Sequence, residues 1–438
     1  MAENHCELIV FGRYPRVGRV KTRLIPSLGP ARAALLQKRL TEATISAARE
    51  TIRQLNGRLV FCHDGGSQNK IAAWLGKSSA DWVRQSSGDL GKRMLTAFQR
   101  SFNKGAGRVL LIGTDIPGIT SQLLEGAFEA LNNHDLVLGP STDGGYWLVG
   151  MNKPQDIFSN MAWSRPDVLE NTWARANEIG MKSFFLETLT DLDTEEDLKQ
   201  ASLMGNQHSP YVSVIIPTLN EERWIVETIR RARSEDAEIL ISDGGSTDRT
   251  IDLANRSGAR IVSGKKGRAG QLNRAAAVAK GEVFFFLHAD TKPPEQYVEH
   301  IFDSLMDRKA VLGAFRFDTD LETPAMKRIG YWTNVRAKLF NLPYGDQGFF
   351  LRKRDFRSVG GFPDVPIAED LYLARKMVGL GRLVIAPASA VTSGRRWERL
   401  GPMRTTLVNT LIAAGCLVGI PPHRLAALYQ LPKRRTVS

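Results

Sequence analysis

The chain of 438 residues has only three cysteines, Cys6, Cys62 and Cys416, and they lie far apart. An odd number without a pairing pattern argues against a disulfide framework and favours a reducing compartment. The sequence also lacks a zinc-finger spacing, a Walker-type phosphate loop and the aromatic signature of an RNA-recognition motif. We therefore do not expect a zinc finger, an ordinary P-loop ATPase or an RNA-recognition domain of that kind.

Long hydrophobic runs are missing as well. The longest uncharged stretch covers residues 405–422 and contains Asn409, several threonines and Gly415. Because it is short and rather polar for a membrane span, we expect a buried or membrane-surface helix there. The apolar residues 8–11 are too few for a signal peptide. These features predict a cytoplasmic protein, with residues 400–438 as a candidate for peripheral contact with the inner face of the cell membrane.

Acidic residues are outnumbered by basic ones, 46 against 59, so the formal net charge is +13. Such a field attracts polyanions, which include nucleic acids, anionic membranes and phosphorylated small molecules. The basic residues are spread along the chain without a nucleic-acid-binding motif, and we expect no nucleic-acid partner. The hydrophobic fraction of 42% and the charged fraction of 24% are ordinary for globular domains, and the length suggests two or three of them.

Two similar segments open two similar halves. Residues 7–11 and 211–216 are apolar runs followed by loops with glycine or proline, which is typical of a first buried parallel strand. Residues 109–115 and 283–290 are later apolar runs that each end in an aspartate. The alternation of strand and helix patterns predicts α/β domains whose ligands collect at the carboxyl ends of the strands. We interpret the chain as two related domains, 1–203 and 211–438, joined by a polar linker at 204–210.

Five short motifs follow each other in the second half. They are PTLNEE at 217–222, SDGGSTD at 242–248, a basic glycine loop at 264–268, LHAD at 287–290 and AED at 368–370. In this order they resemble the family 2 glycosyltransferases, which adopt the GT-A fold. The resemblance covers nearly all of residues 211–400.

The resemblance implies a site for a nucleotide-sugar donor. In that family an Asp-x-Asp motif holds a divalent metal ion; here it is His288-Ala289-Asp290, so Asp290 is the implied ligand of Mg²⁺ or Mn²⁺. His288 replaces the first acid: it either bonds the ribose, joins a manganese ion or is a core histidine with its bonds satisfied. Arg268 is implied to contact the diphosphate, with an ordinary surface arginine as the alternative. The implied donor residues are Pro217, Thr218, Glu221, Asp243, Arg268, His288, Arg395 and Arg396.

The pair Glu369-Asp370 lies at the expected start of a helix. The resemblance makes Asp370 the general base of an inverting transfer, with Glu369 beside it. The alternative is a pair of acids that only stabilises the helix N-terminus. Arg395-Arg396-Trp397 resembles the basic-Trp motif of the family members that build polymers processively, but the Gln that usually begins this motif is absent. Its absence favours addition of a single sugar to a small-molecule or lipid-linked acceptor. Asp346, Gln347 and Trp397 are the expected acceptor-side residues.

The first half contains its own candidate phosphate site. Residues 12–24 form a basic loop with glycines between a strand and a helix, which suits phosphate. With later motifs at 90–93, 113–117, 139–147 and 191–194, the loop resembles nucleotidyltransferases related to the guanylyltransferases of cofactor synthesis. The resemblance implies that Lys21, Arg23, Asp143, Gly144 and Tyr146 contact nucleotide or substrate, and that Asp115 together with Asp191 or Asp193 holds one magnesium ion. Asp143 in a tight turn and Asp193 as a helix cap are the structural alternatives.

Together the resemblances imply two tandem GT-A-like, Rossmann-like α/β/α sandwich domains with mostly parallel sheets. Their order resembles the paired transferases associated with radical-SAM and selenium-domain gene clusters, which are also labelled arsenosugar-biosynthesis glycosyltransferases. The leading hypothesis is a bifunctional transferase. One alternative keeps only the glycosyltransferase active beside a binding or regulatory domain. Another is a basic scaffold that binds membrane or nucleic acid without catalysis.

Overall fold

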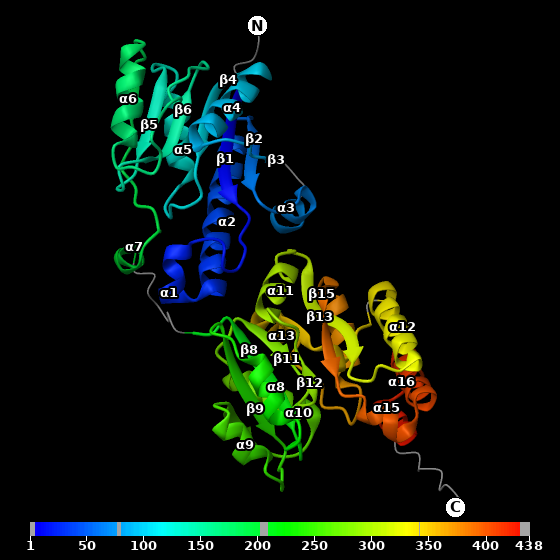
Figure 1. Cartoon of the computed structure of the whole chain (residues 1–438). Coiled ribbons are helices and arrows are strands. Elements are labelled where there is room, and N and C mark those ends of the chain that lie inside the picture. Colours follow the sequence, from blue (N-terminus) through cyan, green and yellow to red (C-terminus); the bar gives the residue numbers. More distant parts are fainter. Residues whose placement is uncertain (1–4, 77–79, 202–208, 341, 430–438) are drawn as a thin grey trace, which may run out of the picture. The chain divides into compact units, whose positions relative to one another are not determined.

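The computed structural model describes residues 5–76, 80–201, 209–340 and 342–429 (Figure 1). The chain divides into two compact units, residues 1–207 and 208–438. Residues 204–208 of the predicted linker lie outside the described residues. Each unit contains one β-sheet with helices packed on it, so the prediction of two tandem α/β domains is confirmed.

The first unit contains a seven-stranded sheet of strand order β3-β2-β1-β4-β6-β5-β7. Its first strand is buried at every position except its two ends, as expected for a strand that is covered on both faces. The strands are β1 His5–Arg13, β2 Arg58–Asp64, β3 Ala80–Arg84, β4 Ala106–Ile112, β5 Leu136–Pro140, β6 Tyr146–Met151 and β7 Ser183–Phe185. The helices are η1 Thr22–Leu24, α1 Ile25–Leu28, α2 Pro30–Gln54, α3 Gln68–Leu75, α4 Leu90–Asn103, α5 Ser121–Ala130, α6 Val168–Glu178 and α7 Glu195–Gln200.

The second unit contains an eight-stranded sheet of order β10-β9-β8-β11-β14-β13-β15-β12. Its strands are β8 Val212–Thr218, β9 Ala237–Asp243, β10 Arg260–Ser263, β11 Val283–Phe286, β12 Thr291–Lys292, β13 Ala310–Thr319, β14 Phe349–Arg352 and β15 Arg382–Thr392. Its helices are α8 Ile225–Ala232, α9 Thr250–Arg256, α10 Arg268–Val278, α11 Tyr297–Ser304, α12 Pro324–Phe340, η2 Gly345–Gln347, α13 Lys353–Ser358, α14 Glu369–Val378, α15 Arg395–Leu400, α16 Pro402–Leu417 and α17 Pro422–Tyr429.

The two sheets have the same topology once the two-residue strand β12 is set aside. Numbered within its own unit, each sheet then has the order 3-2-1-4-6-5-7. The same neighbours are antiparallel in both sheets, the fourth with the sixth strand and the fifth with the sixth, and the fifth and seventh strands are parallel in both. This correspondence extends the sequence similarity of the two halves to their whole strand arrangement.

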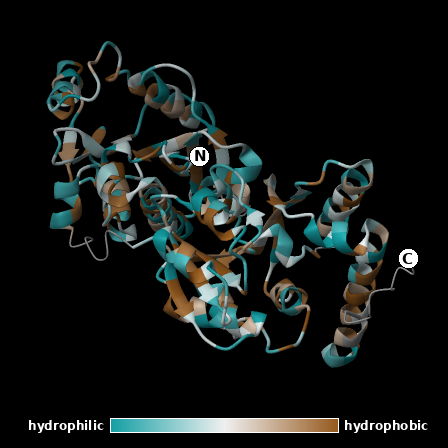
Figure 2. Cartoon of the chain, turned by 60° about the horizontal axis from the view of Figure 1, so that its bottom comes forward, coloured by the Kyte–Doolittle hydropathy of each residue, from teal (hydrophilic) through white to brown (hydrophobic). Residues whose placement is uncertain are grey.

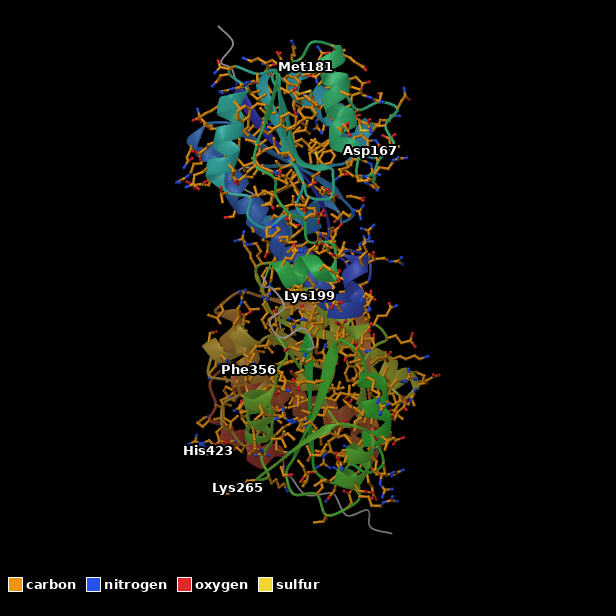
Figure 3. All side chains as sticks on the ribbon, turned by 90° about the vertical axis from the view of Figure 1, so that its left-hand side faces the viewer. Asp167, Met181, Lys199, Lys265, Phe356 and His423 are labelled. Carbon is orange, nitrogen blue, oxygen red and sulfur yellow. The ribbon has the colours of Figure 1, made fainter. Side chains whose placement is uncertain are left out.

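The cores of both units consist of the apolar strands and the inner faces of their helices, and Figure 2 shows these strands in brown. In the second unit, Phe356, labelled in Figure 3, packs edge to face on Phe284 and Phe362. Such pairs add to the energy of apolar burial. The packing fixes β11 against the helices that follow it, and the carboxyl end of β11 carries His288 and Asp290.

Candidate functional site

A pocket of about 790 Å³ lies in the second unit at the carboxyl ends of β8 and β11. The carboxyl ends of strands are where ligands bind in α/β sheets. The pocket collects twelve of the fourteen residues that the sequence implied for this unit's donor, metal, acceptor and catalytic sites. They are Pro217, Thr218, Glu221, Arg268, His288, Asp290, Asp346, Glu369, Asp370, Arg395, Arg396 and Trp397.

Arg395 joins two carboxylates of the pocket. Its Nη1 and Nη2 lie 2.8 Å from the two carboxylate oxygens of Glu221, and its Nε lies 3.0 Å from Asp290 Oδ2. Burial raises the pKa of Asp290, although the charge of Arg395 opposes that shift. The hydrogen bond with Glu221 raises the pKa of Arg395. The guanidinium therefore stays charged and pairs with Asp290, the candidate metal ligand.

A second basic residue, Arg268, lies at the first turn of α10. Its Nε lies 3.2 Å from Glu369 Oε1, and its Nη2 contacts His288 Nε2. Burial, and then the charges of Arg268 and Arg395, hold the pKa of His288 well below its ordinary value. The imidazole is therefore neutral, and its Nε2 accepts a hydrogen bond from Arg268. Burial also raises the pKa of Glu369, although Arg268 opposes the shift.

The general-base candidate Asp370 is held by backbone groups. Its Oδ2 accepts a hydrogen bond from Gly345 N at 2.6 Å and its Oδ1 accepts one from Leu371 N at 2.8 Å. A Cβ on Gly345 would lie 3.0 Å from Asp370 Oδ2, so glycine permits this close approach. The preceding Ala368 has φ 60°, an uncommon conformation for a residue other than glycine. Backbone strain of this kind clusters at functional sites.

Asp346 and Trp397 each bring an unpaired polar atom to the pocket. Asp346 Oδ1 and Trp397 Nε1 are buried and have no hydrogen-bond partner among the described residues. Burial raises the pKa of Asp346 to about 6. Because unsatisfied buried polar groups are costly, these two atoms are candidates for contacts with a bound substrate.

Two implied residues do not line the pocket and act within the protein. Asp243 accepts hydrogen bonds from Gly245 N at 2.7 Å and Ser246 N at 2.9 Å, which shapes the loop after β9. Gln347 is fully buried, donates to Phe315 O at 2.9 Å and accepts from the backbone N–H of Tyr344. In this structure both side chains stabilise loops beside the pocket.

Sequence reasoning missed Gln271 and Tyr344, which both line the pocket. Gln271 Nε2 donates to Thr218 O at 2.9 Å and to Ser242 O at 2.7 Å, so it ties the ends of β8 and β9 together. The centre of the Tyr344 ring lies 3.5 Å from the Arg336 guanidinium carbon. Neither residue belongs to a recognisable sequence motif. Gln271 is a single polar residue within a predicted helix, and such a residue does not by itself indicate a ligand site.

The first unit has a related arrangement at the ends of its own strands. Lys21, which follows β1, lies 2.7 Å from Asp115 Oδ1 and 2.8 Å from Asp193 Oδ1. Its side chain is almost fully buried and its backbone is left-handed, with φ 47°. Burial alone would lower the pKa of Lys21, but the two carboxylates raise it above its ordinary value.

Lys21, Asp115 and Asp193 form a triad, and the other implied residues of the first unit differ in how closely they are linked to it. Burial, and then the charges of Asp143 and Asp193, raise the pKa of Asp191, which places these three acids in one electrostatic neighbourhood. Asp143 accepts a hydrogen bond from Gly145 N at 3.0 Å, in a tight turn. Arg23 is exposed.

Gly144 and Tyr146 are engaged with the body of the first unit. Gly144 has φ 85°, and a Cβ there would collide with Pro166 O. The Tyr146 side chain packs against the hydrophobic core, and burial raises its pKa. These contacts give both residues a structural role.

Each unit has a cluster of one cation and two acids, and the two clusters occupy equivalent strand ends. The positions of the cation and of one acid are exchanged between them. In the first unit the cation follows strand one, and the acids follow strands four and seven. In the second unit the cation Arg395 follows strand seven, and the acids Glu221 and Asp290 follow strands one and four. The aspartate after the fourth strand is the shared element, and in both units it contacts a positive charge.

These acids are the candidate ligands of a divalent metal ion. Over the described residues, no group of three or more His, Cys, Asp or Glu side chains is arranged to hold a metal ion. Asp290 presents one carboxylate with hard oxygen donors to the pocket. Mg²⁺ and Mn²⁺ commonly bind to one or two carboxylates plus substrate phosphates. The donor set therefore fits a cation that a diphosphate completes.

Comparison with known families now bears on both units. Residues 213–360 match the profile described as "Glycosyl transferase family 2". The second unit carries a family 2 glycosyltransferase domain. Residues 47–165 match a family described as "Uncharacterized protein conserved in bacteria". The expected family of the second half is thus confirmed. The finer resemblance to radical-SAM-associated transferases stays a prediction.

Individual relatives agree with this division. The chain is 28% identical over 217 residues to "Probable glycosyltransferase YdaM" of Bacillus subtilis, covering 43% of this chain and 51% of that protein. It is 26% identical over 191 residues to "Phosphoenolpyruvate guanylyltransferase" of Chloroflexus aggregans, covering 42% of this chain and 92% of that protein. A solved candidate nucleotide-diphospho-sugar transferase from Desulfovibrio desulfuricans G20 is 31% identical, with 45% of this chain and 87% of that chain covered and a TM-score of 0.42. The chain spans about half the length of the Bacillus relative.

Proposed function

We propose that the family 2 domain transfers one sugar from a nucleotide sugar to an acceptor hydroxyl, with inversion at the sugar carbon. The observation that carries this proposal is that Arg268, Arg395 and Asp290 line the same pocket as Asp370. The two cations suit a diphosphate, and the Asp370 carboxylate suits an acceptor proton. Inversion needs these two functions on separate groups.

Each group then has a task that its contacts support. Asp370, oriented by Gly345 N and Leu371 N, accepts the proton of the attacking hydroxyl. Glu369 positions Arg268 through their ion pair, and Arg268 meets the negative charge of the departing diphosphate. The neutral His288 offers a hydrogen bond to a ribose or sugar hydroxyl.

A divalent ion fits this site through Asp290. When bound, Mg²⁺ or Mn²⁺ neutralises charge that develops on the diphosphate leaving group. Asp290 would hold the ion, and Arg395 would compensate the remaining negative charge of Glu221.

Donor turnover tests the proposal. The purified chain with Mn²⁺ should release nucleoside diphosphate from at least one common nucleotide sugar, and Asp290→Ala and Asp370→Asn should lose most of that release. Arg256→Ala, an exposed arginine whose ion-pair partner is Asp252, is the matched control and should keep it. If no common donor is turned over by the wild type with either metal, the proposed reaction is wrong.

For the first unit we propose nucleotidyl transfer, which would make the chain bifunctional. The support is the triad of Lys21, Asp115 and Asp193, in which a buried cation and two acids meet at strand ends. Lys21 would contact the phosphates, and the acids would hold Mg²⁺ with them. Pyrophosphate release from a nucleoside triphosphate with phosphorylated small molecules tests this. Release that is unchanged in Asp115→Ala would remove the triad from the reaction and favour a binding or regulatory role.

Substrate and place in the cell are proposed only by class. The acceptor is a hydroxyl compound, either a small molecule or a lipid-linked one, and the link to arsenosugar biosynthesis stays a proposal because fold and family do not fix the substrate. The three cysteines are all free and buried, which is compatible with the proposed cytoplasmic location.

A further inference from the structure

Helix α16 is apolar on two opposite faces. One face is buried and contains Ile412, Ala413 and Cys416. The other face is exposed to solvent. Its apolar residues recur at helical spacing, and they are Met403, Leu407, Leu411, Ala414 and Leu417. Met403 is 83% exposed and Leu407 is 60% exposed. A contiguous row of exposed apolar residues commonly marks an interaction surface, so this second face calls for a covering partner.

Helix α12 contacts α16 and carries a different exposed surface. Tyr331 and Trp332 are 65% and 66% exposed, and their rings meet edge to face with centroids 5.5 Å apart. Lys327, Arg328 and Lys338 are exposed on the same helix. Aromatic rings interleaved with basic side chains are typical of helices that lie in a lipid–water interface. Figure 1 shows α12 in yellow beside α16 in red.

The charged residues of α12 and of residues 402–438 have a single sign. Residues 324–340 contain four Lys or Arg and no Asp or Glu, and residues 402–438 contain five Lys or Arg and again no acid. Residues 430–438 lie outside the described residues and enter only through their sequence. The region therefore complements a surface of negative charge.

The exposed helices adjoin the pocket. Asn409 and Ile412 of α16 line it, and Tyr344 connects the two helices. The Arg336 guanidinium of α12 stacks on the Tyr344 ring, and the Tyr344 hydroxyl donates to Asn409 O of α16 at 3.3 Å. A surface on which α12 and α16 rest would therefore lie next to the substrate cavity.

We propose that the exposed residues of α12 and α16 form a docking face for an anionic lipid surface. The apolar residues of α16 and the aromatic pair of α12 enter the interface, while the basic residues meet lipid headgroups. The described residues include no helix that could cross a membrane, so the contact is peripheral. The inference does not depend on the proposed sugar transfer, although it would bring a lipid-linked acceptor to the pocket.

A second copy of this chain is a poorer occupant. A symmetric dimer through this face would bring two surfaces of the same positive sign together, which costs energy without compensating acids. A lipid headgroup layer supplies both the negative charge and the apolar layer that the two helices lack. Figure 2 shows brown segments among teal ones on the helices near the C-terminal trace.

Vesicle flotation of the full chain tests the docking face. The wild type should float with vesicles of phosphatidylcholine mixed with phosphatidylglycerol, and poorly with phosphatidylcholine alone. Lys327→Gln/Arg328→Gln should weaken the flotation about tenfold or more, since each basic residue near an anionic surface contributes substantially. Tyr331→Ser/Trp332→Ser and Leu407→Ser/Leu411→Ser should weaken it by a similar factor.

Matched controls come from the first unit. Trp173→Ser/Phe185→Ser removes an exposed aromatic pair, and Arg100→Gln/Lys104→Gln removes two exposed charges; both should float like the wild type. Thermal unfolding checks that each variant folds, which is expected because the substituted residues are exposed. Three results overturn the proposal: no flotation of the wild type, equal flotation with both vesicles, or equal loss in the controls. A concentration-dependent doubling of mass that the α16 variants abolish would assign the face to a second copy instead.

Discussion

Substitution of Asp346 by Asn should stabilise the second unit at neutral pH and leave its stability almost unchanged in acid. Burial raises the pKa of Asp346 to about 6 in the folded chain, and the charges of Asp370 and Asp290 add to the shift against Arg336 and Arg268. In the unfolded chain an aspartate has a pKa of about 3.9. The folded protein therefore binds a proton more tightly than the unfolded one.

The sign of the pH dependence follows from this difference. Below about pH 4 Asp346 is protonated in both states, and the favourable contribution of its raised pKa is fully present. As the pH rises through about 6, the folded state must bear an unfavourable charge and that contribution is lost. The amide that replaces this carboxylate carries no charge at any pH, so the advantage of the Asp346→Asn variant grows between these two values.

The magnitude has an upper bound of about 3 kcal/mol, because the pKa difference is about 2 and each pKa unit corresponds to about 1.4 kcal/mol. Asp346 as a whole residue is only partly buried, so solvent screens part of the charge and we expect about 1–2 kcal/mol. For a unit of this size that is a rise in Tm of roughly 2–8 °C.

Thermal unfolding at about pH 4 and about pH 8 measures the effect. The Tm to compare is that of the unfolding transition of the second unit, which contains Asp346. Asp252→Asn, at an exposed aspartate of the same unit, is the control and should change Tm little at either pH. The reasoning is refuted if Asp346→Asn changes Tm equally at both pH values, or lowers it at the higher one.

Three further outcomes follow from the contacts of single residues. Arg395→Lys should lower donor turnover about as much as Arg395→Ala, because only the planar guanidinium spans Glu221 and Asp290; full activity of the lysine variant would contradict this. Lys21→Met should destabilise the first unit by about 1–2 kcal/mol, since it leaves two half-exposed acids without their cation, and Lys21→Met/Asp115→Asn should recover part of the loss in urea unfolding. Gln271→Leu should cost about 1–3 kcal/mol and raise the KM for the donor, because two carbonyls lose their donor; an unchanged KM would separate Gln271 from the pocket.

Much of the site of the second unit could be predicted because its residues belong to local motifs. Asp290 and His288 end an apolar strand, and Glu369 and Asp370 begin a helix, so each position follows from short-range pattern. The same patterns could not tell which side of a loop each side chain takes. Asp243 and Gln347 share motifs with pocket residues, yet their polar atoms are satisfied by neighbouring backbone groups.

The sequence by itself determined the two α/β halves, their order and the aspartate after the fourth strand of each, because apolar runs and the residues that end them are local properties. Only the tertiary structure decided which charges meet: Lys21 between Asp115 and Asp193, and Arg395 between Glu221 and Asp290, with partners up to 174 residues apart in the chain. It also decided that α16 has a second apolar face that no described residue covers. Such pairings depend on sheet order and on burial, and these come from the packing of distant segments that no local pattern records.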